Sequence, residues 1–276
     1  MKFAFSTLAC PQWTTKKVVD HAVRLGYKGL EWRLLDGEII DPVKDADSLK
    51  QAIALAYSQG VETCAFDTSC KFNLSDADER ARNVESLQQW ITFVQTLDTP
   101  AKRLLRVFGG EDSGNSLEEG TQRVADALLQ VAKQAEAAQA TIVLETHDGF
   151  ASSHRVAQVI KLVNSPAIAA LWDSHHPYRV GESVQEVMQQ LDGHIAHVHV
   201  KDARRVVSDP TKWQLVPMGN GEVPVYAQLQ ILQKHNYTGY ISVEWEKRWH
   251  PEIDEPELAL PQHIDWLRAM EKSLSK

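Results

Sequence analysis

The chain has 276 residues, with 29 Lys and Arg against 37 Asp and Glu, which gives a formal net charge of −8. Hydrophobic residues make up 43% and charged residues 24%, a balance that excludes disordered, collagen-like and coiled-coil proteins. The acidic balance argues against a nucleic-acid partner or an anionic membrane surface, because such partners need a basic face. The length predicts one large domain or two small ones with a substantial core.

The cysteines and the apolar runs bear on location. Cys10, Cys64 and Cys70 form no C-x-x-C pair, so neither a disulfide framework nor a thiolate zinc site is expected. The N-terminal segment lacks a long apolar core, and the longest apolar run, 167–172, is far shorter than the roughly 18 residues of a membrane helix. These features favour a cytoplasmic protein in which Glu, Asp and His would hold any metal.

Strand-like and helical segments alternate along the whole chain. Helix starts are indicated by capping patterns such as Ser75 with Asp78, Ser116 with Glu119 and Ser183 with Glu186. In chain order we predict strand 2–8, helix 14–25, strand 27–33, helix 48–59, strand 61–66, helix 75–97, strand 102–108, helix 116–138, strand 141–146, helix 153–163, strand 167–173, helix 183–191, strand 195–201, helix 224–235, strand 239–245 and helix 257–273. The segment 202–223 is predicted to be a loop.

This alternation determines the expected fold class. Repeated strand–helix units favour parallel strands joined by helical crossovers. Eight such units in about 250 residues fit a closed (β/α)₈ TIM barrel, which we expect as a single domain over residues 1–276. An open doubly wound sheet is the alternative. No G-x-G-x-x-G follows a predicted strand, so the dinucleotide-binding form of that sheet has no support.

Each of the last four predicted strands carries a metal-binding side chain at or near its end: Glu145, Asp173, His199 and Glu244. In a barrel the carboxyl ends of all strands meet on one face, so these four side chains should converge. Three carboxylates and one imidazole suit a divalent ion, with Mn²⁺ expected first and Mg²⁺, Co²⁺ or Zn²⁺ as alternatives. Separate salt bridges or helix caps are the structural alternative, but four such residues in register favour a metal site.

Several segments carry a resemblance. LETHDG, LWDSHH, HVHVKD and SVEWE, together with GYKGLEWR, RVFGG and GNGEVP, resemble the xylose-isomerase-like barrel superfamily, in particular its sugar phosphate isomerase/epimerase family. The resemblance covers nearly the whole chain. It implies that Glu145, Asp173, His199 and Glu244 bind one divalent ion. It also implies a small sugar or keto-polyol as substrate, and members of this family often form homo-oligomers.

Other residues are candidates for substrate binding. The family's D-x-x-H pattern places His176 near the substrate oxygens, and the arginine found six positions after the metal histidine in ketose 3-epimerases corresponds to Arg205. Position near a strand end adds four further candidates: Lys201, His147, Glu31 (beside Arg33) and Trp13. Rim ion pairs, exposed loop positions and simple packing are their structural alternatives. His197 should lie one layer below His199, which favours a supporting role.

The expected chemistry is enolisation. An ion that chelates a carbonyl and its neighbouring hydroxyl acidifies the C–H between them and stabilises an enediolate. Glu145 and Glu244 could then remove and return the proton, which makes an isomerase or epimerase the favoured prediction. Ketose 3-epimerases of the family carry a second glutamate where this chain has Ala151. A lyase therefore stays open, such as an inosose or dehydroshikimate dehydratase or an enzyme that cleaves 3-keto-glycosides.

Two further classes of protein have less support from the sequence. A DNA-repair apurinic endonuclease of this fold needs extra zinc-binding histidines at the ends of strands three and four, where the chain has Asp67 and Phe108, and it needs a basic face. A non-catalytic barrel would be favoured if the protein held no metal. On strand eight we expect Glu246 to face the helices, so that its substitution matters less than that of Glu244.

Overall fold

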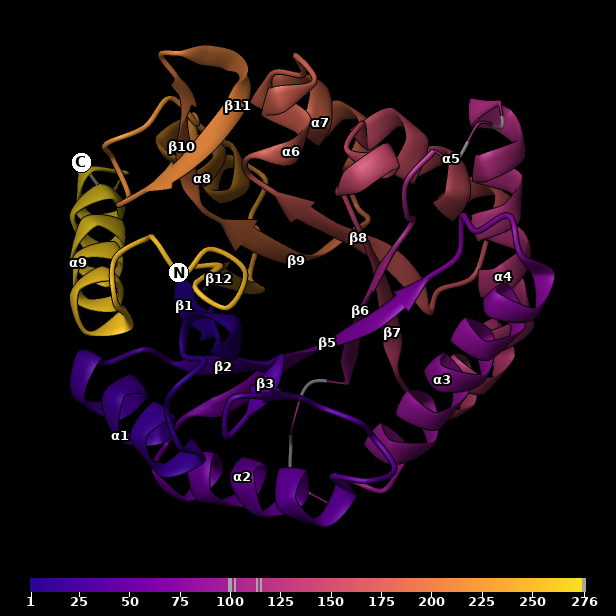
Figure 1. Cartoon of the computed structure of the whole chain (residues 1–276), viewed down its shortest axis with the longest axis horizontal. Helices are drawn as coiled ribbons and strands as arrows, with labels where there is room; N and C mark the ends of the chain where they lie inside the picture. Colours follow the sequence, from indigo (N-terminus) through magenta and orange to yellow (C-terminus); the bar gives the residue numbers. More distant parts are fainter. Residues whose placement is uncertain (99–100, 102, 113, 115, 275–276) are drawn as a thin grey trace.

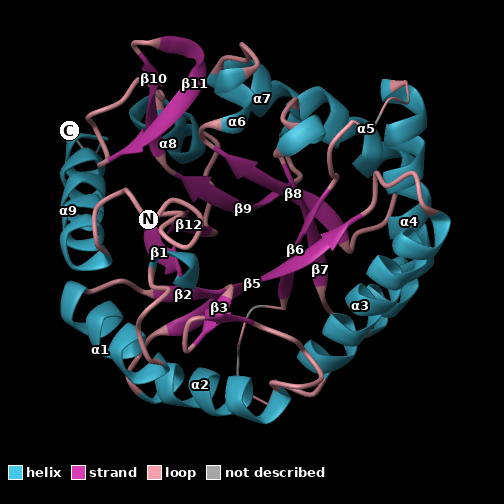
Figure 2. Cartoon of the chain, viewed as in Figure 1, coloured by secondary structure: helices cyan, strands magenta, loops and turns pink. Residues whose placement is uncertain are grey.

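The computed structural model describes residues 1–98, 101, 103–112, 114 and 116–274. These residues form a closed barrel of eight parallel strands in the order β1-β12-β9-β8-β7-β6-β5-β2. Helices surround the ring of strands (Figure 1, Figure 2). The predicted TIM barrel is therefore confirmed, and the alternative of an open sheet is wrong. None of the described helices combines the length and apolar character needed to span a bilayer.

All eight predicted strand–helix units are present, with boundaries shifted by a few residues. The barrel strands are β1 (Lys2–Ser6), β2 (Gly29–Trp32), β5 (Glu62–Lys71), β6 (Leu104–Phe108), β7 (Thr141–Glu145), β8 (Ile168–Asp173), β9 (Ile195–Val200) and β12 (Tyr240–Val243). The surrounding helices are α1 (Thr15–Leu25), α2 (Ala46–Ser58), α3 (Ala77–Gln95), α4 (Leu117–Ala137), α5 (Ser153–Val163), α7 (Val184–Leu191), α8 (Val225–Lys234) and α9 (Pro256–Leu274). Position 102, the expected start of the fourth strand, lies outside the described residues.

Strand alternation decides which side chains enter the barrel. Successive residues of a strand point to opposite faces, and in β7 Ile142 and Leu144 pack in the large core cluster, whereas Val143 packs in a separate small cluster. The small cluster also holds Leu171 of β8. Two residues further along each strand, the same inward face carries Glu145 and Asp173. The apolar layer inside the barrel thus lies directly beneath a layer of acidic side chains.

The segment 202–223 is not the simple loop that we expected. Asp202–Val206 (β10) and Asp209–Val216 (β11) pair as an antiparallel hairpin, which lies on the rim near α8 and the short helix α6 (His176–Arg179) (Figure 1). Most of its side chains are exposed, so the apolar alternation that indicates a half-buried strand is weak here. A second small hairpin, β3 (Leu34–Leu35) with β4 (Glu38–Ile39), follows β2.

The capping predictions are confirmed at two helices and wrong at one. Ser116 and Ser183 each form a reciprocal capping box at the start of α4 and α7. For α3 the cap is Asp76, whose side chain accepts hydrogen bonds from two backbone N–H groups of the first turn, and not Ser75. A carboxylate at this position also interacts favourably with the positive end of the helix dipole.

Asp202 fixes the glycine-rich loop after the hairpin. Its side chain accepts hydrogen bonds from the backbone N–H groups of Gly219 at 2.8 Å, Gly221 at 2.9 Å and Val223 at 3.2 Å. A Cβ atom at position 221 would lie 2.1 Å from Asp202 Oδ1, so only glycine permits this close approach. The loop is thereby held next to the carboxyl end of β9.

Candidate metal centre

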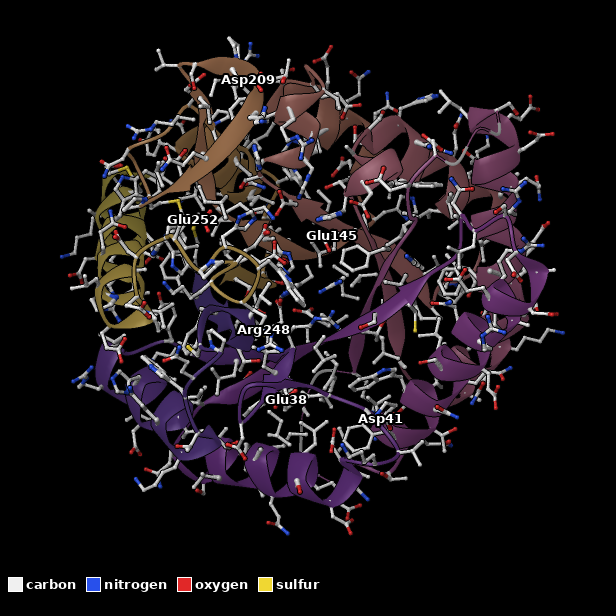
Figure 3. All side chains as sticks on the ribbon, in the orientation of Figure 1. Glu38, Asp41, Glu145, Asp209, Arg248 and Glu252 are labelled. Carbon is white, nitrogen blue, oxygen red and sulfur yellow. The ribbon has the colours of Figure 1, made fainter. Side chains whose placement is uncertain are left out.

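Four side chains converge at the carboxyl end of the barrel. Glu145, Asp173, His199 and Glu244 are all buried, and one ligand atom from each lies within 4.8 Å of the others. They come from β7, β8, β9 and the residue that follows β12, as the sequence predicts. Figure 3 shows Glu145 near the centre of the ring, whereas Asp209 lies at its outer edge.

The spacing of the four ligands suits a metal ion. His199 Nδ1 lies 3.3 Å from Glu145 Oε1 and 3.6 Å from Glu244 Oε1. Ligands that bind a tetrahedral ion at about 2.1 Å are separated by about 3.4 Å. The side chains therefore need little movement to hold an ion, and their oxygen and nitrogen atoms are donors that Mn²⁺, Mg²⁺, Co²⁺ and Zn²⁺ accept.

A second group of potential ligands, Glu31 with His197 and His199, lies against the first. Here Glu31 Oε2 is 2.5 Å from His197 Nε2, and Glu31 Oε1 is 2.8 Å from His199 Nε2. These separations are those of hydrogen bonds and leave no room for an ion between the atoms. Burial opposes the charge on Glu31, but the two imidazoles hold its pKa well below the usual range.

Two of the carboxylates, those of Glu145 and Asp173, also contact protein groups outside the set of four. Arg106 Nε lies 3.4 Å from Glu145 Oε2, and the backbone N–H groups of His175 and His176 donate to Asp173 Oδ1 at 2.7 and 3.1 Å. In each of these carboxylates, one oxygen thus contacts a protein donor that is not among the four converging side chains. Such second contacts orient metal ligands and restrict them to one binding mode.

Lys201 holds the third carboxylate. Its Nζ lies 2.5 Å from Glu244 Oε2, 2.6 Å from Glu246 Oε1 and 3.2 Å from Asp173 Oδ2. Glu246 thus lies at the site and not on the helix side, which corrects our expectation. The expectation assumed that the strand continues past Glu244, whereas β12 ends at Val243 and Glu246 lies in the segment that follows it.

The carboxylates of the site carry more negative charge than the positive side chains in contact with them neutralise. Asp173 Oδ2 is buried and accepts no hydrogen bond from the described residues. Burial, followed by Glu244 and Glu145, raises the pKa of Asp173 to about 6, although Lys201 opposes this rise. A carboxylate with a raised pKa at the centre of such a cluster is one that a divalent ion would stabilise. The residues present therefore fit a divalent cation.

Of the residues predicted to bind substrate, His176 and His147 lie near the four ligands. His176 Nε2 is 4.0 Å from Asp173 Oδ1, and the rings of His176 and His147 are 4.0 Å apart. His147 Nδ1 lies 2.7 Å from Asp148 Oδ1. Burial lowers the pKa of His176 well below its usual value, so its ring is neutral at neutral pH.

The structure places Arg205 and Trp13 elsewhere. Arg205 is exposed on β10, with its guanidinium 5.2 Å from the centre of the Trp213 ring. Trp13 is buried, and its Nε1 donates to Glu257 of α9 at 3.0 Å. Substrate binding by Arg205 and Trp13 stays a prediction. Both positions follow strand ends in sequence, but the loops that carry them turn toward the hairpin and α9.

Sequence reasoning missed Arg106 as well as the position of Glu246. Arg106 is 2% exposed and lies between Asp67 and Glu145, with its Nε 3.5 Å from Asp67 Oδ1. A signal for it exists in the sequence. Arg106 falls two residues after Leu104, which packs inside the barrel, so the period of two predicts an inward arginine near the mouth.

Comparisons with known proteins agree with this geometry. Residues 19–270 match the family model "Xylose isomerase-like TIM barrel". Over 206 residues the chain is 25% identical to L-ribulose-5-phosphate 3-epimerase UlaE of Escherichia coli K12, which covers 72% of this chain and 68% of the relative. The chain therefore belongs to the xylose isomerase-like TIM barrel family, among whose members it is similar to sugar epimerases.

Solved structures show the same fold. The IOLI protein with a bound zinc atom superposes with a TM-score of 0.79 at 18% identity, over 99% of this chain and 98% of that chain. The probable 3-DHS dehydratase AsbF from Bacillus anthracis superposes with a TM-score of 0.76 at 17% identity, over 97% and 99%. Structural neighbours of this barrel thus carry names of more than one reaction type.

Metal binding should depend on pH through His199. Although burial opposes it, Glu31, Glu244 and Glu145 raise the pKa of His199 well above its usual value, so the metal-free imidazole holds a proton that an ion must displace. We expect Mn²⁺ affinity to fall by up to about tenfold per pH unit as pH drops through and below this raised pKa. Calorimetric titration in buffers of different ionisation enthalpy measures the released proton. An affinity that does not change with pH would contradict this assignment.

Proposed function

We propose that this protein is a divalent-metal-dependent isomerase or epimerase that acts on a sugar or keto-polyol through an enediolate. The observation that carries the proposal is the pair of buried glutamates, Glu145 and Glu244, whose Oε1 atoms lie 3.3 and 3.6 Å from His199 Nδ1. Strands β8 and β9 lie between the strands that carry them. The two carboxylates therefore approach a bound substrate from different sides.

The ion and the protein groups have separate roles in this proposal. A divalent ion held by Glu145, Asp173, His199 and Glu244 would polarise a substrate carbonyl and stabilise the charge of the enediolate. One glutamate removes a proton from the carbon next to the carbonyl, and the other returns a proton from a different direction or to a different carbon. Lys201 outweighs burial and holds the pKa of Glu244 well below its usual range, so this carboxylate is ionised and can accept a proton.

Substrate contacts are proposed for three of the candidates: His176, Lys201 and His147. His176 Nε2 is buried and has no hydrogen-bond partner among the described residues, so a substrate hydroxyl or carbonyl would satisfy it. Lys201 supplies an ammonium group beside Asp173 and Glu244, where substrate oxygens would lie. The proposal includes a small-molecule substrate, Mn²⁺ as the first ion to test and a cytoplasmic location.

A lyase of the same family is the second candidate, and two observations favour it. Ala151 is buried where ketose 3-epimerases of the family carry a second glutamate. His147, held by Asp148 at 2.7 Å, lies close to His176 and offers another proton-transfer group. In an elimination, a glutamate removes the proton next to the carbonyl, a hydroxyl leaves from the adjacent carbon, and an acid protonates it to water. The relative UlaE is an epimerase, which supports the first candidate. The structural neighbour AsbF is named a probable dehydratase, which is a reaction of the second type.

Glu145→Gln and Glu244→Gln should each lower turnover by at least about 10²-fold, because each removes an acid–base group and a metal ligand. The assay is C–H exchange in deuterated water, followed by NMR with a panel of keto-sugars and keto-polyols. Glu38→Gln, at an exposed position on β4, is the matched control and should retain full activity. Deuterium incorporation without loss of water identifies an isomerase or epimerase. Product formation with loss of water identifies a lyase, and retained activity in Glu244→Gln would refute both.

Glu246→Gln tests the corrected position of this side chain. Burial opposes ionisation of Glu246, but Lys201 lowers its pKa to about 2, so the two form a charged pair that fixes the ammonium group. We expect kcat/KM to fall about 10- to 100-fold when this support is removed. Glu252→Gln, which is exposed in the same loop, should be close to wild type. Equal activity of the two variants would show that Lys201 needs no second carboxylate.

A further inference from the structure

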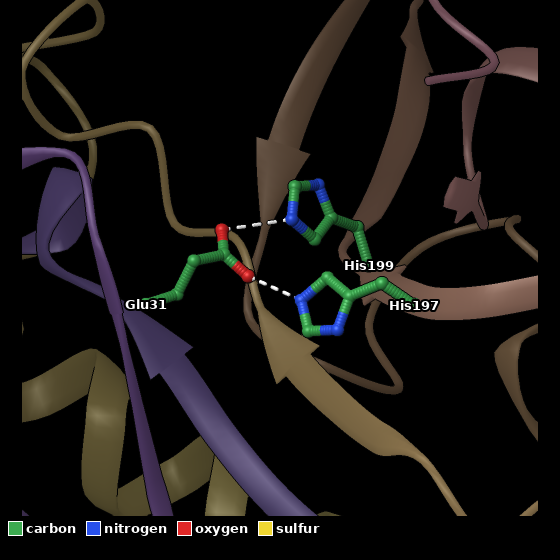
Figure 4. Close-up of side chains that lie close together, drawn as sticks. All are labelled: Glu31, His197 and His199. Atoms are coloured by element: carbon green, nitrogen blue, oxygen red, sulfur yellow. Dashed lines mark hydrogen bonds and ion pairs between the residues drawn. The ribbon is translucent and has the colours of Figure 1, made fainter. Parts of the chain in front are cut away.

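Glu31, His197 and His199 form a buried chain of hydrogen bonds across the barrel (Figure 4). All three side chains are 0% exposed. Glu31 comes from β2 and the two histidines from β9, and β1 and β12 lie between these strands in the closed sheet. The contacts therefore span the interior of the barrel and do not follow from strand pairing.

The geometry determines where the protons lie. Each oxygen of Glu31 faces one imidazole Nε2, at 2.5 Å for His197 and 2.8 Å for His199. A carboxylate only accepts hydrogen bonds, so both Nε2 atoms must carry a proton. For His199 the Nε2 proton stays in the hydrogen bond to Glu31, so Nδ1 is the ring nitrogen whose proton an ion would displace. The same ring nitrogen lies 3.3 Å from Glu145 Oε1, on the side where the other ligands converge.

We propose that Glu31, anchored by His197, is a positioning residue that fixes the tautomer and ring orientation of His199 and so presents Nδ1 to the divalent ion. This inference rests on the proposed function only in taking Glu145, Asp173, His199 and Glu244 as the metal ligands. It replaces the substrate contact that the sequence suggested for Glu31. Carboxylates that accept the second N–H of a metal-binding histidine are a general means of orienting the ring and raising its basicity.

His197 has a distinct part in this arrangement. Its Nε2 holds Glu31 Oε2, so the carboxylate cannot rotate about its last bond without losing a hydrogen bond inside the barrel. His197 and His199 are two residues apart on one strand and point to the same face, with ring centres 5.5 Å apart and planes at 78°. One carboxylate can therefore bridge both rings, which locks the pair of histidines as a unit.

Two other roles for Glu31 fit the structure less well. A second ion among Glu31, His197 and His199 would require the atoms to separate, because 2.5 and 2.8 Å are hydrogen-bond distances. Direct contact with substrate would require an exposed oxygen, and Glu31 has none exposed. Positioning of His199 accounts for the burial of Glu31 and for its hydrogen bonds to both imidazoles.

The test is metal binding to Glu31→Gln. Glutamine has the same shape but offers one acceptor and one donor group, so only one of the two histidines can keep its bond. We expect the affinity for Mn²⁺, titrated into metal-free protein, to fall about 10- to 100-fold. We also expect the visible spectrum of the Co²⁺-loaded protein to change. Glu31→Asp keeps the charge but is one methylene shorter, so it should also lose affinity. His197→Phe keeps Glu31 and should lose less.

Glu62→Gln is the matched control. It removes an acidic group from β5, next to β2, where Glu62 accepts a hydrogen bond from Tyr240 at 2.6 Å, remote from the metal ligands. Its metal affinity and Co²⁺ spectrum should equal those of wild type. If Glu31→Gln does not fold, Glu31→Asp and His197→Phe carry the same measurement.

The outcomes separate this inference from the proposed function. Metal affinity and a Co²⁺ spectrum that are unchanged in the Glu31 variants, while Glu244→Gln abolishes binding, would overturn the positioning role and leave the metal centre standing. Affinity lost in Glu31→Gln would support positioning even if the wild-type protein turned over no sugar or keto-polyol. That second result would count against the proposed reaction alone.

Discussion

The structure depends on how the barrel accommodates buried negative charge at its carboxyl end. Three carboxylates, Glu145, Asp173 and Glu244, share a space of a few ångströms and are nearly inaccessible to water. Burying one unpaired charge costs many kcal/mol, and placing like charges together adds to that cost. Arg106 and Lys201 offset part of the charge from behind the ligands. A 2+ ion bound among these carboxylates would complete the balance and favour the ionised form of Asp173, whose pKa is raised to about 6 without it.

Much of the fold and of the ligand set could be predicted from the sequence, because both follow from local patterns. The eight strand–helix units are visible as alternating apolar periods, and the barrel places all strand ends on one face. Glu145, Asp173, His199 and Glu244 fall at such ends. The net charge of −8 therefore includes three carboxylates that are buried in the barrel and are not surface charge.

The sequence alone could not predict contacts between side chains of strands that are not neighbours in the barrel. That Glu31 accepts a hydrogen bond from His199 depends on which residues of β2 and β9 face each other across the barrel, and no local pattern encodes this. The hairpin that carries Arg205 was not predicted for a related reason: its strands are largely exposed and have weak apolar alternation. The position of Glu246 was not predicted because β12 ends at Val243, so the direction of this side chain depends on the segment after the strand.

The same ligand set supports several reactions, because the ion and the two glutamates fix the intermediate and not the product. The groups that surround the substrate decide whether a proton returns or a hydroxyl leaves. The groups that we propose for this role are His147, His176 and Lys201, together with Ala151 in place of a carboxylate. This division explains how one barrel can occur in proteins named as epimerases and as dehydratases.

The most direct test of the central claim is a crystal structure of the protein loaded with Mn²⁺, with the ion located by its anomalous scattering. The account predicts a single ion bound by His199 Nδ1 and by one oxygen each of Glu145, Asp173 and Glu244, with His199 Nε2 still donating to Glu31. An ion located between Glu31, His197 and His199, or bound only at surface carboxylates, would contradict it.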